Sequence, residues 1–285
     1  MDSGLYLVST PIGNMGDITA RAVDTLRAVD VVYAEDTRRT GLLLHTLDID
    51  AELRSLHEHN EAGRCQEVVD RLGSGGSCAL VSDAGTPIVS DPGRRVVEAA
   101  IAAGHPVFSV PGASAILAAL TVAGLDASGF MFVGFAPRRG RERAEWLAGV
   151  VDSPVSVVAF ESPRRLAATL EDLHELGAGE RAAAVCRELT KKFEEVRRGT
   201  VAQLVEYYTD TEPRGEVTLV LGGRPAGDDG YAESAVPRAR ELAASGRTAR
   251  DISRALAEEL GVPRNEAYRI ALDATEGEGD VSSGR

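Results

Sequence analysis

Short apolar runs alternate with helix-period segments along most of this chain, and this alternation constrains its fold more than any other feature. The strand-like runs include residues 5–8, 31–34 and 78–81, and the segments between them, such as 18–28, carry apolar residues at helical spacing. Strands that alternate with helices are typical of an α/β domain with a largely parallel sheet. We therefore expect such a domain at the start of the chain.

A second set of strand-like runs follows a helical segment at 114–123. These runs lie at 130–135, 155–160, 182–186 and 217–221. After the second run, Ser162 and Pro163 are typical of a helix start, as the cap and the first helical residue. The pattern predicts two α/β domains, at residues 1–115 and 116–222.

The chain beyond residue 222 differs in composition. Residues 222–230 contain Gly, Asp and Pro, which is typical of a linker. We expect a helical unit at 231–275, where Thr248 and Asp251 form a capping-box pattern ahead of an apolar stripe. Two short helices joined by a glycine-containing turn resemble a helix-turn-helix, but a packing or dimerisation appendage explains them equally well. The remaining residues, 276–285, have a composition typical of a disordered tail.

The distribution of charge favours a focused basic face on an acidic protein. The net charge of −13 argues against a protein that binds nucleic acid by bulk electrostatics. Residues 137–200, however, hold twelve Arg and Lys against eleven Asp and Glu. The positive side chains gather at 138–143, 164–165 and 191–198. This pattern suits a structured anionic substrate, although solvated surface charge explains it nearly as well.

The sequence carries no signal for membrane insertion, export or metal binding. No apolar run approaches the roughly 18 residues of a membrane span, and the N-terminus lacks the basic start and apolar stretch of a signal peptide. The three cysteines are far apart, and His57 and His59 have no third ligand at a suggestive spacing. We expect a cytoplasmic protein that holds no metal.

Four loops rich in Gly, Pro and small polar residues follow strands of the first domain. Ligands of open α/β sheets bind at such carboxyl ends of strands. The loop with Pro11 and Gly13 can bring its backbone close to a ligand, and Asp83 in the loop 82–88 can accept hydrogen bonds from ribose hydroxyls. The loop 110–115 offers backbone amides and a hydroxyl, and the stretch 35–39 is polar. One such loop is ordinary turn chemistry, but four in one domain indicate a binding site.

The segments that carry these loops resemble the successive motifs of the ribosomal small-subunit methyltransferase I family. They are the run of residues 5–44, then VSDAGTPIVSDPG, VPGASAILAAL, GFAPRRGRER, VAFESPRRL and RELTKKFEEVRRGT, in that family's order. The resemblance extends over residues 5–221. It implies an α/β two-domain tetrapyrrole methylase fold with a small C-terminal helical appendage, S-adenosylmethionine in the cleft between the domains, and a homodimer.

The resemblance also implies a reaction and a set of cofactor residues. The reaction is 2′-O-methylation of a cytidine in the decoding region of 16S rRNA, in the 30S subunit or an assembly intermediate. By position in the motifs, the residues that bind the cofactor are Pro11, Gly13, Asp83, Gly85, Thr86, Ile88, Ser114, Ala115, Phe160 and Glu161.

Methyl transfer to a ribose hydroxyl calls for a group that takes the hydroxyl proton. Several corrin-precursor methylases of the wider class have a candidate catalytic aspartate at the position of Glu35. We therefore predict that Glu35 is the base or orients the substrate, with Asp36 as its rival, although either carboxylate could equally well support the loop. Because guanidinium and ammonium groups suit phosphates, we predict RNA contacts for Arg38, Arg138, Arg139, Arg164, Lys191 and Arg197.

Two other functions stay open. A methylase of the same fold could act on a tetrapyrrole or, as in diphthine synthesis, on a modified histidine of an elongation factor. A non-enzymatic RNA-binding protein could use the C-terminal helices, but this alternative does not explain the four loops. The arginine-rich segments favour the enzyme that acts on RNA.

Overall fold

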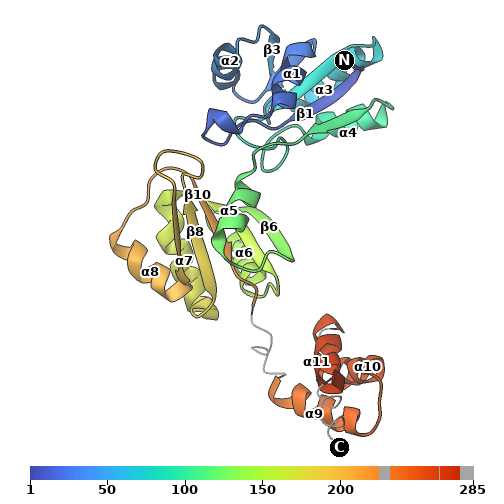
Figure 1. Cartoon of the computed structure of the whole chain (residues 1–285), viewed down its shortest axis with the longest axis vertical. Helices are drawn as coiled ribbons and strands as arrows, with labels where there is room; N and C mark the ends of the chain where they lie inside the picture. The colour runs from blue at the N-terminus through green and yellow to red at the C-terminus, as the bar shows by residue number, and fades with distance from the viewer. Residues whose placement is uncertain (225–231, 263, 277–285) are drawn as a thin grey trace, which may run out of the picture. The chain divides into compact units, whose positions relative to one another are not determined.

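The computed structural model describes residues 1–224, 232–262 and 264–276 (Figure 1). The chain divides into two compact units, residues 1–222 and 223–285. Most of the predicted linker at 222–230, and of the predicted tail at 276–285, lies outside the described residues.

The first unit begins with a parallel sheet of five strands. They are β1 (Gly4–Val8), β2 (Val31–Ala34), β3 (Glu52–Ser55), β4 (Ser77–Val81) and β5 (Val107–Val110), in the order β3-β2-β4-β1-β5. Each neighbouring pair is parallel, which confirms the prediction for this part of the chain. The sequence does not predict β3, because this half-exposed edge strand reads Glu-Leu-Arg-Ser and has a single apolar side chain.

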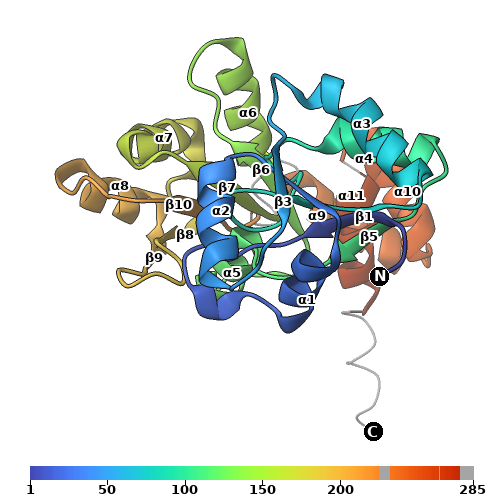
Figure 2. The ribbon, with the colours of Figure 1, turned by 90° about the horizontal axis from the view of Figure 1, so that it is seen from above.

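Helices cover both faces of this sheet. They are α1 (Ala20–Ala28), α2 (Thr37–Thr46), α3 (Glu61–Gly73) and α4 (Arg94–Ala102). Alternate residues of β2 face opposite cores, since Val32 packs with α1 and α2 while Tyr33 packs with α3 and α4. Figure 2 shows the two pairs of helices on opposite sides of the strands. Burial on both faces explains why these strands read as continuous apolar runs.

Helix α2 begins at Thr37, inside the polar stretch that the sequence analysis counts among the four loops. The Asp36 carboxylate accepts a hydrogen bond from the backbone N–H of Arg38 and so caps the helix at Thr37. The polar stretch 35–39 is therefore not a loop throughout, since its second half is the first turn of α2.

A second sheet follows in the same unit and is mixed. Its strands are β6 (Phe130–Phe135), β7 (Ser156–Glu161), β8 (Ala182–Arg187), β9 (Glu195–Thr200) and β10 (Val217–Leu221), in the order β6-β7-β10-β8-β9. The pair β6–β7 is parallel and the other pairs are antiparallel. The sequence predicts four of these strands. The polar strand β9 is not predicted, because it lies at an edge and reads Glu-Val-Arg-Arg-Gly-Thr.

One face of the second sheet packs on α5 (Ala115–Ala123), and the other packs on α6 (Arg141–Val151), α7 (Leu166–Leu173) and α8 (Val201–Asp210). A 3-10 turn that starts at Pro163 precedes α7, so the predicted helix start at this proline is confirmed. The predicted cap is wrong, because the Ser162 side chain makes no capping hydrogen bond and the turn delays the α-helix by three residues.

The second unit holds three helices within the described residues, α9 (Ala232–Ala244), α10 (Ala249–Leu260) and α11 (Arg264–Glu276). Their apolar faces form a separate core that includes Leu242, Ile252 and Leu256. Thr248 caps α10 by accepting a hydrogen bond from the Asp251 backbone, as the capping pattern predicts. The sequence does not predict α9. None of the helices in the described residues is long and apolar enough to span a membrane.

Candidate functional site

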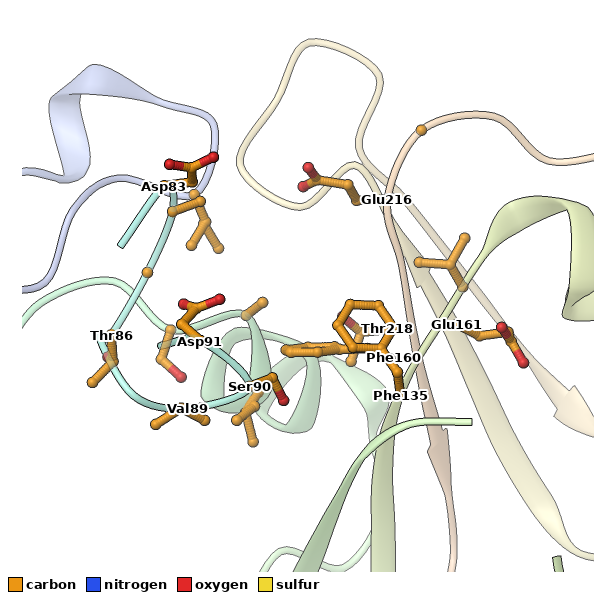
Figure 3. Close-up of a pocket in the computed structure, with 18 of the residues that line it drawn as sticks. Asp83, Thr86, Val89, Ser90, Asp91, Phe135, Phe160, Glu161, Glu216 and Thr218 are labelled. Atoms are coloured by element: carbon orange, nitrogen blue, oxygen red, sulfur yellow. The ribbon is translucent and has the colours of Figure 1, made fainter. Parts of the chain in front are cut away.

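A cavity of about 510 Å³ lies where the carboxyl ends of β1, β2, β4 and β5 meet the ends of β6, β7 and β10 (Figure 3). Its size is typical of a small-molecule site. The first sheet contributes the loops that follow its strands, and the second sheet contributes side chains at its edge. The predicted site residues in its wall are Glu35, Asp83, Gly85, Thr86, Ser114, Ala115, Phe160 and Glu161.

Hydrogen bonds join three of the predicted loops into one wall. The backbones of Thr10 and Gly85 exchange two hydrogen bonds, of 2.9 and 3.0 Å. The Thr86 hydroxyl lies 3.2 Å from the Ser9 hydroxyl and donates to the carbonyl of Ala113 at 3.3 Å. The loops after β1, β4 and β5 are therefore held in register, which gives a ligand a preformed surface.

The loop after β4 holds an unusual backbone conformation. Ile88 and Ser90 have φ angles of +76° and +68°, in the left-handed region that residues other than glycine rarely adopt, a β-branched one such as Ile88 least of all. Such conformations cost on the order of 1–3 kcal/mol each and persist where the surroundings enforce them. Here the buried carboxylate of Glu61 accepts hydrogen bonds from the backbone N–H groups of Gly93 (3.2 Å) and Arg95 (2.7 Å) and anchors the end of the loop. Motif reading does not identify Glu61, because its partners lie about thirty residues away.

The loops of the first sheet bring three carboxylates to the cavity, those of Glu35, Asp83 and Asp91, and the guanidinium of Arg39 lines it beside them. Asp83 is held in place, because one oxygen accepts a hydrogen bond from the backbone N–H of Asp36 at 3.0 Å and the other pairs with Arg39 at 3.1 Å. Asp91 is not among the predicted residues, although it stands in the same motif as Asp83, and its side chain points into the cavity in Figure 3. The wall on this side is therefore strongly acidic.

The surroundings of Glu35 raise the pKa of its carboxyl group. Burial raises the pKa of Glu35, and the negative charges of Asp91 and Asp83 raise it further. Burial likewise raises the pKa of Asp91. Within the described part of the chain, no group donates a hydrogen bond to the Glu35 carboxylate. Its oxygens are therefore available to a ligand.

Asp36, the predicted rival, lies outside the cavity wall. Its two oxygens accept hydrogen bonds from the Arg38 side chain at 3.0 and 2.7 Å, and one also caps α2. Hydrogen bonds from Arg38 hold the pKa of Asp36 well below its ordinary value. This carboxylate serves the helix start in the structure.

Three predicted cofactor residues lie beside the main cavity or away from it. Pro11 and Gly13 line a smaller cavity of about 290 Å³, which shares Arg39 and Asp83 with the main one. At Gly13 a Cβ atom would lie 2.3 Å from the Lys191 side chain, so a glycine lets that lysine approach. Ile88 lines neither cavity, and its side chain packs against the core that α3 and α4 form with the first sheet.

The two predicted cofactor residues of the second sheet differ in what they offer. Phe160 presents its ring to the cavity and packs against Phe132, with ring centroids 5.0 Å apart. Glu161 is 3% exposed, pairs with Arg165 at 2.6 Å and accepts a hydrogen bond from Thr169 at 2.6 Å. Figure 3 shows its carboxylate directed away from Asp83 and Asp91. The carboxylate of Glu161 is thus used inside the fold.

The six predicted RNA contacts separate into two groups. Arg38, Lys191 and Arg197 are each paired with a carboxylate, and Arg197 also lies 3.3 Å from the centre of the Tyr207 ring. The other three, Arg138, Arg139 and Arg164, are exposed and form no ion pair with any residue that the structure describes.

No metal site is evident in the described ranges, where no group of three or more His, Cys, Asp and Glu side chains is placed to hold an ion. His57 and His59 contact each other edge to face, with ring centroids 6.0 Å apart. Cys78 and Cys186 are buried and Cys65 is half-buried, and free cysteines in such places pack as small apolar residues.

Comparison with known proteins identifies the family. The family of tetrapyrrole (corrin/porphyrin) methylases matches residues 4–205. Ribosomal RNA small subunit methyltransferase I of Synechocystis sp. is 44% identical over 271 residues, which are 94% of this chain and 97% of that protein. The protein of the same name from Mycobacterium tuberculosis is 42% identical over 96% of both chains. This chain belongs to the ribosomal RNA small subunit methyltransferase I family.

A solved structure extends this result to the fold. Uroporphyrin-III-C-methyltransferase from Thermus thermophilus matches with a TM-score of 0.54 and 24% identity, over 77% of this chain and 94% of that protein. The resemblance seen in the sequence and the tetrapyrrole methylase fold are therefore confirmed. The predicted cofactor is confirmed as well, since methylases of this family depend on S-adenosylmethionine.

The residues of the cavity fit S-adenosylmethionine. The cofactor carries positive charge on its sulfonium and ammonium groups, and Asp83 and Asp91 supply opposite charge. Its own carboxylate suits backbone N–H groups at a helix start, which α5 presents at Ser114 and Ala115. The apolar wall that includes Phe160 suits an adenine ring.

Proposed function

We propose that this protein transfers a methyl group from S-adenosylmethionine to the ribose 2′-hydroxyl of a cytidine in the decoding region of 16S rRNA. Family membership supports methylation of small-subunit rRNA. The observation that carries the proposal is the cavity, which places Glu35, a carboxylate with a raised pKa, in the same wall as the acidic groups that suit the cofactor.

In this proposal, Glu35 acts as the base. S-adenosylmethionine supplies an electrophilic methyl group on a sulfonium. A ribose hydroxyl is a weak nucleophile, and its attack is assisted by a carboxylate that accepts its proton. A raised pKa makes Glu35 a better proton acceptor than an ordinary glutamate. Asp36 is a weaker candidate, because both of its oxygens bind Arg38.

The cofactor would be held by the preformed loops and by the edge of the second sheet. Asp83, Thr86, Ser114 and Phe160 line the cavity directly, and Ile88 maintains the loop between them. Pro11 and Gly13 would contact the part of the ligand nearest the smaller cavity. Glu161 would take part through its backbone or by supporting its neighbours, because its carboxylate is engaged.

Exposed arginines would position the RNA. Arg138, Arg139 and Arg164 are unpaired among the described residues, so their guanidinium groups can bind phosphate without breaking an existing ion pair. Arg38, Lys191 and Arg197 would first have to exchange a carboxylate partner.

Several further parts of the proposal derive from the family resemblance or from the sequence pattern. From the resemblance come a homodimeric assembly and a substrate that is either the 30S subunit or an assembly intermediate. The domain boundaries at 115/116 and 222 and a cytoplasmic location, which the sequence pattern predicts, are also part of the proposal. The role of the C-terminal helices belongs with these, as RNA contact and packing both suit them.

The test is a methylation assay that offers 30S subunits and free 16S rRNA with labelled S-adenosylmethionine, followed by mapping of the modified nucleotide. We expect one 2′-O-methylated cytidine in the decoding region. A methyl group on a base, or at another position of the rRNA, would contradict the proposed target. Methylation of a tetrapyrrole or of elongation factor in place of rRNA would favour the alternative enzymes.

Two controls sharpen this test. Calorimetry with S-adenosylmethionine should show binding, and a protein that does not bind it would be better explained as a non-enzymatic RNA-binding protein.

A Glu35→Gln variant should bind the cofactor and the RNA while its kcat falls by roughly 10²- to 10⁴-fold, the usual contribution of a general base. Unchanged turnover in this variant would exclude Glu35 as the base.

A further inference from the structure

Phe135 is an exposed aromatic side chain in the wall of the cavity, and neither cofactor binding nor proton transfer as described above uses it. It ends β6, and 59% of its surface is exposed. Its ring lies beside that of Phe160, with centroids 5.3 Å apart. Figure 3 shows both rings reaching from the second sheet toward the loop that carries Ser90 and Asp91. A large apolar side chain left exposed in a cavity wall marks a surface that a ligand covers.

A β-bulge puts Phe135 on this face of the sheet. In the pairing of β6 with β7, Phe132 faces Val158 and Phe135 faces Phe160, so three steps along β6 match two along β7. Side chains of a regular strand alternate, and Phe135 would then point to the face opposite Phe132. The extra residue returns it to the face of Phe132 and Phe160. Gly134, with φ +66°, supplies the left-handed conformation that the bulge needs.

Arginines with two different tasks lie on the segment that follows Phe135 or on the elements bonded to it. Arg143 donates to the carbonyl of Pro137 at 3.0 Å, and Arg165 donates to the carbonyl of Ala136 at 2.9 Å. These two bonds fix the segment that follows Phe135. The same bonds bring the turn that carries Arg164 next to the segment that carries Arg138.

The two anchoring arginines also have carboxylate partners, since Arg143 pairs with Asp172 and Arg165 pairs with Glu161. Arg138, Arg139 and Arg164 have no such partner within the described ranges. The result is an aromatic ring at the rim of the cavity with unpaired guanidinium groups on the residues just beyond it. An aromatic platform beside positive groups is the arrangement that binds unpaired bases of RNA.

We infer that Phe135 stacks on the base of the acceptor nucleotide, which is turned out of its helix, while Arg138, Arg139 and Arg164 bind the phosphates beside it. This inference rests on the proposed function, because it takes an RNA nucleotide as the substrate. Stacking accounts for the exposed ring, and it brings the attached ribose into the cavity whose wall also holds Glu35. A base can stack in this way only after it leaves its neighbours in the helix.

The test compares Phe135→Leu and Phe135→Tyr with the full-length wild type. Leucine keeps an apolar contact with Phe160 but cannot stack on a base, whereas tyrosine can. Phe130→Leu is the matched control, because Phe130 lies at the opposite end of the same strand and is 41% exposed. We expect Phe135→Leu to raise the KM for RNA by roughly 5- to 100-fold, with tyrosine and the control close to wild type. The affinity for S-adenosylmethionine should be unchanged in all of them.

A second measurement locates the stacked base. Wild type and Phe135→Leu are titrated, in the presence of S-adenosylhomocysteine, with an RNA oligonucleotide of the mapped site and with the same RNA lacking the base of the acceptor nucleotide. Removal of that base should weaken binding to the wild type but have little further effect on Phe135→Leu, because both changes remove the same contact. Fluorescence anisotropy gives these affinities without turnover.

The outcomes separate this inference from the proposed function. If the wild type methylates no RNA, the proposed function fails and this inference with it. If the wild type methylates RNA but the effects of the leucine and of the missing base simply add, Phe135 does not contact that base. A Phe135→Leu variant that loses cofactor affinity while its KM for RNA stays unchanged would assign the ring to the cofactor.

Discussion

At the scale of single residues, position rather than residue type gives the candidate base its chemistry. Glu35 and Asp36 are adjacent carboxylates after the same strand, yet their surroundings push their pKa values in opposite directions. Burial and neighbouring carboxylates raise the pKa of Glu35, and hydrogen bonds from Arg38 lower that of Asp36. Two carboxyl groups whose pKa values are shifted in opposite directions are suited to different tasks. The structure therefore favours Glu35 for proton transfer and Asp36 for capping.

The pH dependence of turnover should report the raised pKa of Glu35. A base acts in its ionised form, so kcat should fall as the pH drops through that pKa, which lies above the ordinary glutamate value of 4.5. Asp91→Asn removes a like charge and should move this acidic limb to lower pH. The shift should be partial, because burial is the larger cause of the raised pKa. Single-turnover rates measured across the pH range give the acidic side of the pH–rate profile.

An exposed carboxylate outside the site provides the control for this experiment. Asp210, at the end of α8, does not line the cavity, and Asp210→Asn should leave the limb where it is. If Asp91→Asn leaves the limb unmoved and Glu35→Gln retains it, the titrating base is a different group.

At the scale of secondary-structure elements, the bulge in β6 depends on one backbone conformation. Gly134 has φ +66°, and a Cβ atom there would meet nothing closer than the Ser90 hydroxyl at 3.7 Å. Gly134→Ala should therefore lower the free energy of unfolding by about 1–2 kcal/mol, because alanine disfavours this positive φ angle and not because its Cβ atom clashes. Gly134→Asn should lose less, because asparagine tolerates the left-handed region. Urea unfolding measures both, and an alanine variant as stable as wild type would contradict this account of the bulge.

A second prediction at this scale concerns the contact between β2, β3 and α3. Glu67 accepts hydrogen bonds from Tyr33 at 2.8 Å, Arg54 and Arg64. Burial alone would raise the pKa of Glu67, but these bonds outweigh it and lower the pKa from 4.5 to about 2. A carboxyl group with a lowered pKa stabilises the fold above its ordinary pKa, and this stabilisation is lost as the pH falls from 4.5 toward about 2.

Glu67→Gln should remove that pH-dependent part of the stability. We expect the variant to lose about 1–3 kcal/mol near neutral pH, where a charge-assisted network is replaced by a neutral amide. The difference from wild type should shrink in acid across the same window. Free energies of unfolding in urea at about pH 6 and about pH 3 test this, and a difference that grows on acidification would reverse the assigned sign.

At the scale of the whole molecule, the protein is acidic but leaves part of its positive charge available. With a net charge of −13, it gains little from non-specific attraction to RNA. Binding should then depend on a few local contacts. Arg138, Arg139 and Arg164 are the predicted RNA contacts that need not give up a partner among the described residues.

Salt dependence measures this contribution. Replacing Arg138, Arg139 and Arg164 with Gln should reduce the slope of log affinity against log salt by roughly 2–3, since each lost phosphate contact contributes about 0.7–0.9. Arg141→Gln is the control, because Arg141 is equally exposed but already paired with Glu145. Cofactor affinity should not change in the triple variant. If cofactor affinity falls and the slope stays, these arginines belong to the cofactor cleft or to the fold.

Much of the architecture could be predicted from the local sequence, and the exceptions share a cause. Strands such as β2 and β4 are buried on both faces, so they read as apolar runs. The edge strands β3 and β9 are partly exposed and polar, and their apolar content does not distinguish them from loops. Apolar content therefore predicted even the exposed edge strand β6, whose sequence is Phe-Met-Phe-Val-Gly-Phe, and missed the two polar strands.

The sequence by itself determined the family, the parallel sheet and the loops that form the cavity, because motifs and hydrophobic periods are local. Only the tertiary structure decided which carboxylates share that cavity and which arginines are unpaired. Asp91 joins Glu35 because parallel strands end at a common edge. Arg143 and Arg138 look alike in the sequence, yet Arg143 forms an ion pair with Asp172 while Arg138 is exposed and forms none with the described residues. Charge and pKa depend on neighbours in space, and those neighbours come from distant parts of the chain.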